Sequence, residues 1–190
     1  MAFYILKGND DMNVDIFVGL LAEAAPSLHD LGRCGLVGEQ ANDFVKSFLA
    51  RRCQPPPFKV TGLAGLEGLQ HWDLSNVEIG MVRFPNQPSN RLGGVLIGCV
   101  ESDPLVLISD TGEIVVQEFG TPDHVLWFVA RNGESMLDAL VIAANFLSKR
   151  AVGRIDLQDH EAIRSVVIQC STAAGGEKYL DFFRMLLGAD

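Results

Sequence analysis

Hydrophobic and polar positions repeat with two different periods along the chain, and the changes of period divide it into three stretches. Before the triple proline at residues 55–57, apolar residues recur every three to four positions, which is the spacing of one helical face. From residue 58 to about 130 they alternate with polar residues or form short β-branched runs, which indicates strands. Helical spacing then returns. This order predicts an α+β fold, with a central antiparallel or mixed sheet flanked by N-terminal and C-terminal helices.

The apolar stripes place the expected helices. They run over Ile16–Ala24, Ala41–Leu49, Met136–Leu147, Ile163–Cys170 and Tyr179–Leu187. Asn13 and Asp156 are expected to cap the first and the fourth of these helices, because their side chains can accept hydrogen bonds from the free N–H groups of a first helical turn.

Seven strands are expected in the middle stretch, and their close succession favours antiparallel neighbours. They are Phe58–Thr61, Leu69–Leu74, Val77–Phe84, Gly94–Val100, Leu105–Ser109, Glu113–Phe119 and Val125–Ala130. A further short strand is expected at Phe3–Leu6. The polar, turn-rich stretch from Phe84 to Arg91 is expected to form a mobile loop.

The clearest local feature is Asp110-Thr111-Gly112, which lies between two apolar, β-branched runs. Glycine in the third place takes a positive φ at low cost, so these residues predict the turn of a β-hairpin. Alternation along the second strand of this hairpin then places Glu113 and Val115 on one face, and Ile114 and Val116 on the other.

The composition is that of a folded protein with a sizeable core. The chain has 190 residues, of which 48% are hydrophobic and 21% charged, and a chain of this length most often makes one domain. We therefore expect a single α+β domain over residues 1–190, with the helices from about residue 153 appended to it.

Negative charge is concentrated in one part of the chain. The formal net charge is −9, and between residues 101 and 138 eight acidic side chains stand against Arg131 alone, a local net charge of −7. Such a segment repels nucleic acid and anionic membranes, whose binding requires lysine and arginine. It attracts a basic protein partner. An acidic surface that only aids solubility is the alternative.

Cysteine and histidine usage gives no sign of a metal centre. The four cysteines are scattered without a Cys-x-x-Cys pair, and the four histidines follow no metal-ligand spacing. We therefore expect neither metal nor cofactor, and a reducing cytoplasm as the location. No apolar run reaches the roughly 18 residues that a membrane span requires. The short apolar stretch near the N-terminus lacks the basic region of a secretion signal.

Two arrangements bear on catalysis. Asp110-Thr111-Gly112 after an apolar strand resembles the catalytic loop of aspartic proteases, in which two such aspartates share a proton. This chain has one copy, and the following Glu113 adds a charge that would oppose ionisation of the pair. His124 beside Asp123 is the second arrangement. A hairpin turn and a surface histidine explain both patterns more simply. A small hydrolase of unrecognised type stays open as an alternative function.

Part of the chain resembles a known family. The relevant features lie within residues 94–147: Ile97-Gly98, the strand Asp103–Leu107, the turn Asp110–Ile114, and Trp127–Ala130 ahead of a helix with Met136 and Leu137. This order resembles the SUKH immunity-protein superfamily. The resemblance implies a non-catalytic bacterial immunity protein with a SUKH-like α+β fold, which binds and neutralises a cognate toxin, often a nuclease or deaminase. A regulatory scaffold in a larger complex would fit the same residues.

The acidic hairpin is therefore the expected partner-binding surface, and the basic toxin domain its expected partner. The residues predicted to line an acidic rim, around a cleft bordered by the loop Pro85–Arg91, are Glu101, Asp103, Asp110, Glu113 and Asp123. Trp72 is predicted to lie half exposed at an interface. A solvated strand edge that discourages aggregation is the alternative explanation for the same acids.

Overall fold

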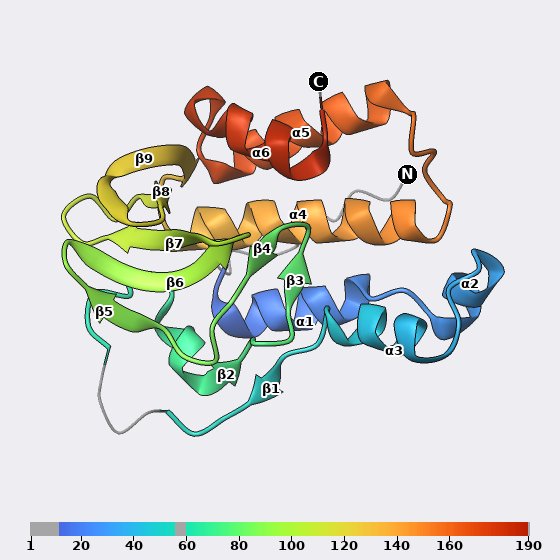
Figure 1. Cartoon of the computed structure of the whole chain (residues 1–190), viewed down its shortest axis with the longest axis horizontal. Helices are drawn as coiled ribbons and strands as arrows, with labels where there is room; N and C mark the ends of the chain where they lie inside the picture. The colour runs from blue at the N-terminus through green and yellow to red at the C-terminus, as the bar shows by residue number, and fades with distance from the viewer. Residues whose placement is uncertain (1–11, 56–59, 190) are drawn as a thin grey trace.

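Helix α4 (Gly133–Ala151) is the central element, and helices that precede and follow it in the chain pack against it. The structure is a computed structural model that describes residues 12–55 and 60–189. Helix α1 (Val14–Ala24) lies on one side of α4, and α5 (His160–Ala174) lies on the other together with α6 (Leu180–Leu187) (Figure 1). Leu137, Leu140 and Ala143 of α4 are fully buried between these layers. The predicted α+β class is confirmed.

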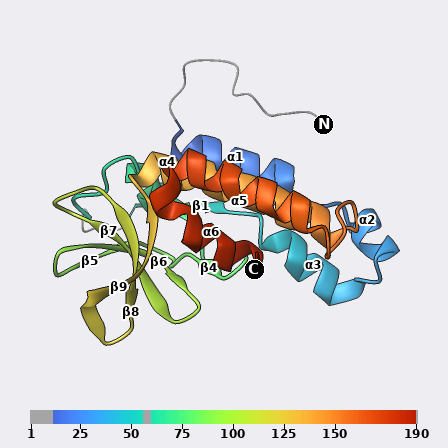
Figure 2. The same cartoon turned by 90° about the horizontal axis from the view of Figure 1, so that it is seen from above.

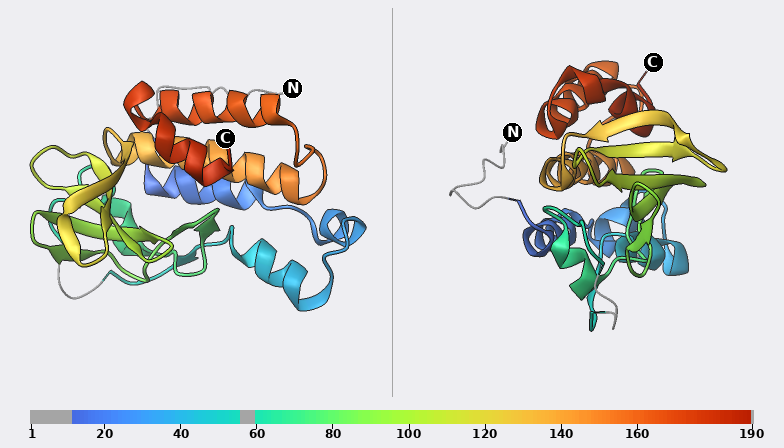
Figure 3. Two further views of the ribbon diagram at one scale, coloured as in Figure 1. Left: turned by 45° about the horizontal axis from the view of Figure 1, so that its top comes forward. Right: turned by 90° about the vertical axis from the view of Figure 1, so that its left-hand side faces the viewer.

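Short elements connect the helices to the sheet. Helices α2 (Leu28–Arg33) and α3 (Gly38–Lys46) follow α1, and the 3-10 helix η2 (Glu177–Tyr179) precedes α6. Strands β1 (Arg51–Arg52) and β2 (Trp72–Asp73) pair with each other beside the 3-10 helix η1 (Glu67–His71). The strands gather at one end of an elongated molecule, and α2 and α3 lie at the other end (Figure 3).

The main sheet is antiparallel throughout. Its strands are β3 (Glu78–Ile79), β4 (Val82–Arg83), β5 (Ser89–Arg91), β6 (Gly94–Val100), β7 (Asp103–Ile108), β8 (Ile114–Glu118) and β9 (Thr121–Ala130). They follow the order β3-β4-β6-β7-β8-β9, and β5 pairs with β6 outside this path. Consecutive strands from β6 to β9 are therefore neighbours joined by short turns, and every second turn lies at the same end of the sheet.

The two faces of the sheet bury different side chains. Ile114 and Val116 of β8 belong to the main core, which also takes in residues of α1, α4, α5 and α6. Val106 and Val115 are equally buried but lie outside that core, as expected for the opposite face. They face each other across β7 and β8. The predicted hairpin turn is also confirmed, since Gly112 has a φ of 72°.

Several predicted boundaries are wrong. In the stretch Leu69–Leu74 the first three residues belong to the 3-10 helix η1, and only Trp72 and Asp73 form a strand, β2. The stretch Val77–Phe84 is split into β3 and β4 because Gly80 turns the chain with a φ of 61°. The predicted mobile loop contains strand β5. Helix α3 ends at Lys46, and α2 has no counterpart in the prediction.

Asp156 does not cap a helix. The cap of α5 is Asp159, whose carboxylate accepts a hydrogen bond from the Ala162 N–H, whereas Asp156 accepts one from Gln158 N–H in the preceding turn. Asn13 caps α1 as predicted. The strand predicted at Phe3–Leu6 lies outside the described residues, as does the first half of Phe58–Thr61, and Val60 and Thr61 are not in a strand.

Gly98 lies where β6 passes close to both of its neighbouring strands. A Cβ atom added there would lie 2.6 Å from the Arg83 carbonyl oxygen and 3.2 Å from the Leu105 side chain. Strand β6 also changes register at this point, between Leu96 and Gly98. The absence of a side chain therefore lets β6 fit between β4 and β7.

We predict that Gly98→Ala destabilises the fold by about 1–3 kcal/mol, because backbone atoms cannot yield to the added methyl group. Chemical denaturation of both proteins measures the difference. Gly19→Ala in α1 is the control, because a Cβ there would meet nothing within 4 Å. Gly93→Ala is unsuitable, because the φ of 79° at Gly93 disfavours any side chain. Equal stability of Gly98→Ala and the wild type would contradict this packing.

The side chain of Asp138 in α4 lies in surroundings that disfavour its charged form. Burial raises the pKa of Asp138 above its ordinary value, Glu134 one turn earlier raises it further, and Arg131 opposes both effects. The folded protein therefore holds this proton more tightly than the unfolded chain. Its contribution to stability is present at acidic pH and is lost as the pH rises through the raised pKa.

Asp138→Asn is accordingly expected to raise Tm at pH 7, because it removes a charge that folding disfavours. The advantage should shrink toward pH 4, because the raised pKa of Asp138 lets the wild-type carboxyl take up a proton as the pH falls. Thermal unfolding followed by circular dichroism at both pH values tests this. A variant that is less stable than the wild type at pH 7 would show that the attraction to Arg131 dominates.

Candidate functional site

Two turns of the sheet place acidic side chains at the same end. The β6–β7 turn carries Glu101, and the β8–β9 turn lies between Glu118 and Thr121. Both turns are at the same end of the strands, opposite the Asp110 turn (Figure 2). We call this surface the acidic turn end. It consists of Glu101, Asp103, Glu118, Phe119 and Asp123.

A hydrogen bond joins the two turns. The Asp103 carboxylate accepts a hydrogen bond from the Phe119 backbone N–H at 2.9 Å, across from β7 to the end of β8. Glu118 lies 3.1 Å from the His124 ring nitrogen Nδ1, and both side chains are exposed. Asp123, on the same strand as His124, is also exposed. Asp103 therefore fixes the position of Phe119, and the other carboxylates remain in contact with solvent.

Phe119 is the exposed apolar residue of this surface and lies in the β8–β9 turn. Its side chain is 74% exposed, which is unusual for a phenylalanine next to a well-formed sheet. Aromatic side chains surrounded by polar groups are typical anchors of protein interfaces. Phe119 was predicted only as the last residue of a strand, and Glu118 was not singled out. The exposure of both depends on the position of the turn, which periodicity does not fix.

Glu101 has a strained backbone. Its φ of 54° makes it the one residue other than glycine with a positive φ in the described part of the chain. A side chain in this region costs on the order of 1 kcal/mol compared with glycine, which is the usual residue here. The Glu101 N–H donates to the Met81 carbonyl at 3.1 Å, which anchors the turn to the β3–β4 hairpin. Glutamate thus occupies a position where glycine would have the lower backbone energy.

The structure does not bring all five predicted rim residues together. Asp110 and Glu113 lie at the other end of β7, roughly 20 Å from Asp103 at strand spacing. The loop Pro85–Arg91 runs toward that second end, because β5 pairs with β6 from Leu96 to Gly94. The predicted single rim around a cleft bordered by this loop is therefore wrong. Glu101, Asp103 and Asp123 share one surface, and the other two acids do not belong to it.

Glu113 already has partners within the chain. Its carboxylate accepts hydrogen bonds from the Lys178 ammonium group and, at 2.8 Å, from the Tyr179 hydroxyl. Lys178 also lies over the Phe128 ring, 4.1 Å from its centre. Burial raises the pKa of Tyr179 to about 12, and the hydrogen bond to Glu113 contributes to the shift. Glu113 therefore attaches the C-terminal helices to the sheet.

Trp72 is half-buried and lies on the small β1–β2 sheet. Its indole N–H donates to the Asp15 carboxylate at 2.7 Å. The Arg52 guanidinium lies over the ring, 4.8 Å from its centre, and also pairs with Asp15. These contacts tie β2 to α1. No contact links Trp72 to the acidic turn end among the described residues.

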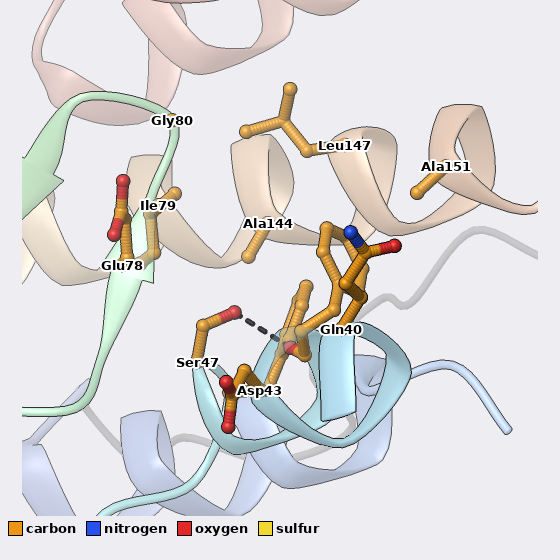
Figure 4. A pocket seen from close by; sticks show the side chains of 11 residues that line it. Gln40, Asp43, Ser47, Glu78, Ile79, Gly80, Ala144, Leu147 and Ala151 are labelled. Carbon is orange, nitrogen blue, oxygen red and sulfur yellow. Dashed lines mark hydrogen bonds between the residues drawn. The ribbon is translucent and has the colours of Figure 1, made fainter. Parts of the chain in front are cut away.

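A groove adjoins the acidic turn end. Its volume is about 590 Å³, and it is lined by Gln40, Asp43, Phe44, Ser47 and Phe48 from α3 and the residues after it, by Glu78, Ile79 and Gly80, and by Ala144, Leu147 and Ala151 of α4 (Figure 4). Ser47 helps to close one side, since its carbonyl accepts a hydrogen bond from the Glu78 N–H at 3.0 Å. The floor is apolar and the rim carries two carboxylates.

No three His, Cys, Asp or Glu side chains converge in residues 12–55 and 60–189 in a way that could hold a metal ion. Asp110 is exposed in its turn, and the Thr111 hydroxyl accepts a hydrogen bond from the Glu113 N–H. Within the same residues, no helix is both long and apolar enough to cross a membrane.

Comparison with known proteins gives no match: no protein-family model, no curated protein and no solved structure matches the chain.

Replacing Glu113 by glutamine tests the attachment of the C-terminal helices. We predict a loss of about 1–2 kcal/mol in unfolding free energy, because two hydrogen bonds lose their charged acceptor. The pKa of Tyr179 should fall toward its ordinary value, which ultraviolet titration of the phenol measures. Asp110→Asn, an exposed acid of the same hairpin, is the control and should change neither quantity. An unaltered Tyr179 titration in Glu113→Gln would contradict the assigned contact.

Proposed function

We propose that this protein is an immunity-type protein that binds and neutralises a basic toxin domain, of nuclease or deaminase type, through the acidic turn end. The observation that carries the proposal is that one end of the sheet carries four acidic residues, Glu101, Asp103, Glu118 and Asp123, together with the exposed Phe119. The partner is a protein, because a surface of this charge repels nucleic acid and anionic lipid. The proposed site of action is the cytoplasm.

The electrostatics of the surface support this function. An enzyme that acts on nucleic acid carries a positively charged groove for phosphates, and carboxylates on a rigid turn can occupy the same positions. Complementary charge also speeds the encounter and excludes wrong partners. Phe119 then supplies the apolar contact that charge alone does not give.

The rigidity of the surface supports it as well. Asp103 holds the β8–β9 turn through the Phe119 N–H, and the Glu101 turn is held by Met81. Such prior ordering lowers the entropy lost on binding. Strain at Glu101 is consistent with selection for binding, since strained residues persist mainly at functional sites. The resemblance of residues 94–147 to the SUKH superfamily supports the same function.

The test begins with affinity capture of the partner from extracts of the native cell. The bait is the wild type or Glu101→Lys/Asp123→Lys, two exposed positions of the acidic turn end. The matched control is Asp110→Lys/Glu177→Lys, which changes the net charge equally at exposed positions elsewhere. All three proteins should have nearly the same Tm, since reversal of exposed charges has little effect on stability.

We expect the wild type and the control to capture a basic protein whose expression alone arrests growth and whose co-expression with the wild type does not. The turn-end variant should associate with this protein at least tenfold more slowly at low salt, and the difference should shrink as salt is raised. Equal association by the two double variants, or a captured partner that is harmless to cells, would contradict the proposal.

A further inference from the structure

Helix α3 leaves an apolar strip uncovered. Within α3 only Ala41 is buried, and Phe44 is half-buried although it lies on the apolar face. The Phe44 ring is 5.6 Å from the Phe48 ring, centre to centre. Across the groove, α4 presents Leu147, which is also half-buried. Apolar side chains of two helices thus face the same space without filling it.

The shape of this space suits a helix. Figure 4 shows Gln40 and Asp43 of α3 on one side, Ala144 and Ala151 of α4 on the other. Alanine side chains are short, so the backbone of another helix can approach α4 closely. A groove between two helices with an apolar floor is the usual receptor for one face of an amphipathic helix. A volume of about 590 Å³ accommodates several apolar side chains of such a helix.

The rim is suited to positive charge. The Asp43 carboxylate pairs with Lys46 at 2.8 Å, and the Glu78 carboxylate pairs with Arg83 at 3.1 Å. All four of these side chains are exposed, and exposed ion pairs contribute little, so an incoming lysine or arginine can replace the internal cation. The floor and the rim together match a helix with one apolar and one basic face.

The groove and the acidic turn end are two parts of one surface. Gly80 of the β3–β4 turn lines the groove, and the adjacent Met81 accepts the hydrogen bond from the Glu101 N–H. Only Met81 thus lies between the groove and Glu101, the first acidic residue of the acidic turn end. A basic partner that contacts Glu101 can reach the groove without leaving the surface.

We infer that the groove between α3 and α4 receives an amphipathic, basic helix of the same partner, which anchors it beside the acidic turn end. This inference rests on the proposed function and adds the partner's docking element to it. In this arrangement charge at the acidic turn end governs the rate of association, and burial in the groove governs the rate of dissociation.

The probe is a synthetic helical peptide of about 15 residues, built from leucine and lysine with one apolar face. Amide NMR spectra of the full-length protein map where it binds. We expect shifts at the groove residues of α3, β3 and α4. Ala151→Trp fills the groove at a half-buried position, and Leu147→Lys places a cation on its floor. Each substitution should lower the affinity for the peptide at least tenfold. Thr172→Trp, exposed on α5, is the control and should bind normally.

A second measurement separates this inference from the proposed function. Toward the captured basic partner, Ala151→Trp should raise the dissociation rate at least tenfold and leave the salt dependence of association unchanged. If the partner dissociates from Ala151→Trp at the wild-type rate while the turn-end variant still associates slowly, the docking of a helix in the groove is overturned and the proposed function is kept. A leucine–glutamine peptide that binds as tightly as the leucine–lysine peptide would overturn the basic occupant. The basic helix would also be overturned as the occupant if native mass spectrometry detected a small apolar molecule bound to the wild type and absent from Ala151→Trp.

Discussion

The burial of helix α4 is the constraint on which the rest of the structure depends. Only two residues separate β9 from α4, and the Asn132 side chain caps the helix by accepting a hydrogen bond from the Ser135 N–H at 2.9 Å. The last residues of β9 must therefore lie at the start of α4. Because the strands are antiparallel, the β8–β9 and β6–β7 turns then lie at the opposite end of the sheet. The position of the acidic turn end follows from the packing of a helix that does not itself contribute to it.

The strands also separate the acidic residues of the segment 101–138 into groups at opposite ends of the sheet. Asp103 and Asp110 are seven positions apart along the chain, yet β7 carries them to opposite ends of the sheet. At the far end Glu113 is bonded to Lys178 and Tyr179, so part of the charge stabilises the contact between the C-terminal helices and the sheet. At the near end Glu101, Glu118 and Asp123 are exposed, and the half-buried Asp103 binds the Phe119 N–H. Acidic residues thus fasten the C-terminal helices at one end, and at the other end Asp103 orders a turn while Glu101 and Asp123 are exposed to solvent.

The sequence predicts the elements whose pattern is strong. Periodicity locates α1, α4 and α6, and Asp110-Thr111-Gly112 locates the central hairpin, because each signal is local. The errors arise where a single residue or a distant contact decides. Gly80 splits one expected strand into two, and β5 forms inside a polar loop because β6 offers a free edge. Asp156 and Asp159 have the same capping chemistry, and the local pattern does not tell which of the two directly precedes α5.

Only part of the acidic turn end is predicted from the sequence, again because distant contacts decide the rest. Acidic composition identifies Glu101, Asp103 and Asp123, and hairpin alternation brings them near a turn. The predicted run of antiparallel strands already places the Asp110 turn at the other end of the sheet, and grouping Asp110 and Glu113 with the other acids by charge alone overlooked this. Lys178 and Tyr179 lie more than 60 positions from Glu113, and no local pattern connects them. The groove is invisible in the sequence, because it arises from side chains that α3 and α4 leave unfilled.

Amide hydrogen exchange of the free protein and of its complex with the basic partner tests the central claim most directly. The account predicts slower exchange on binding in residues 101–103 and 119–123, with residues 110–113 unchanged. Protection confined to residues 110–113, or exchange at both turns of the acidic turn end that binding leaves unaltered, would contradict it.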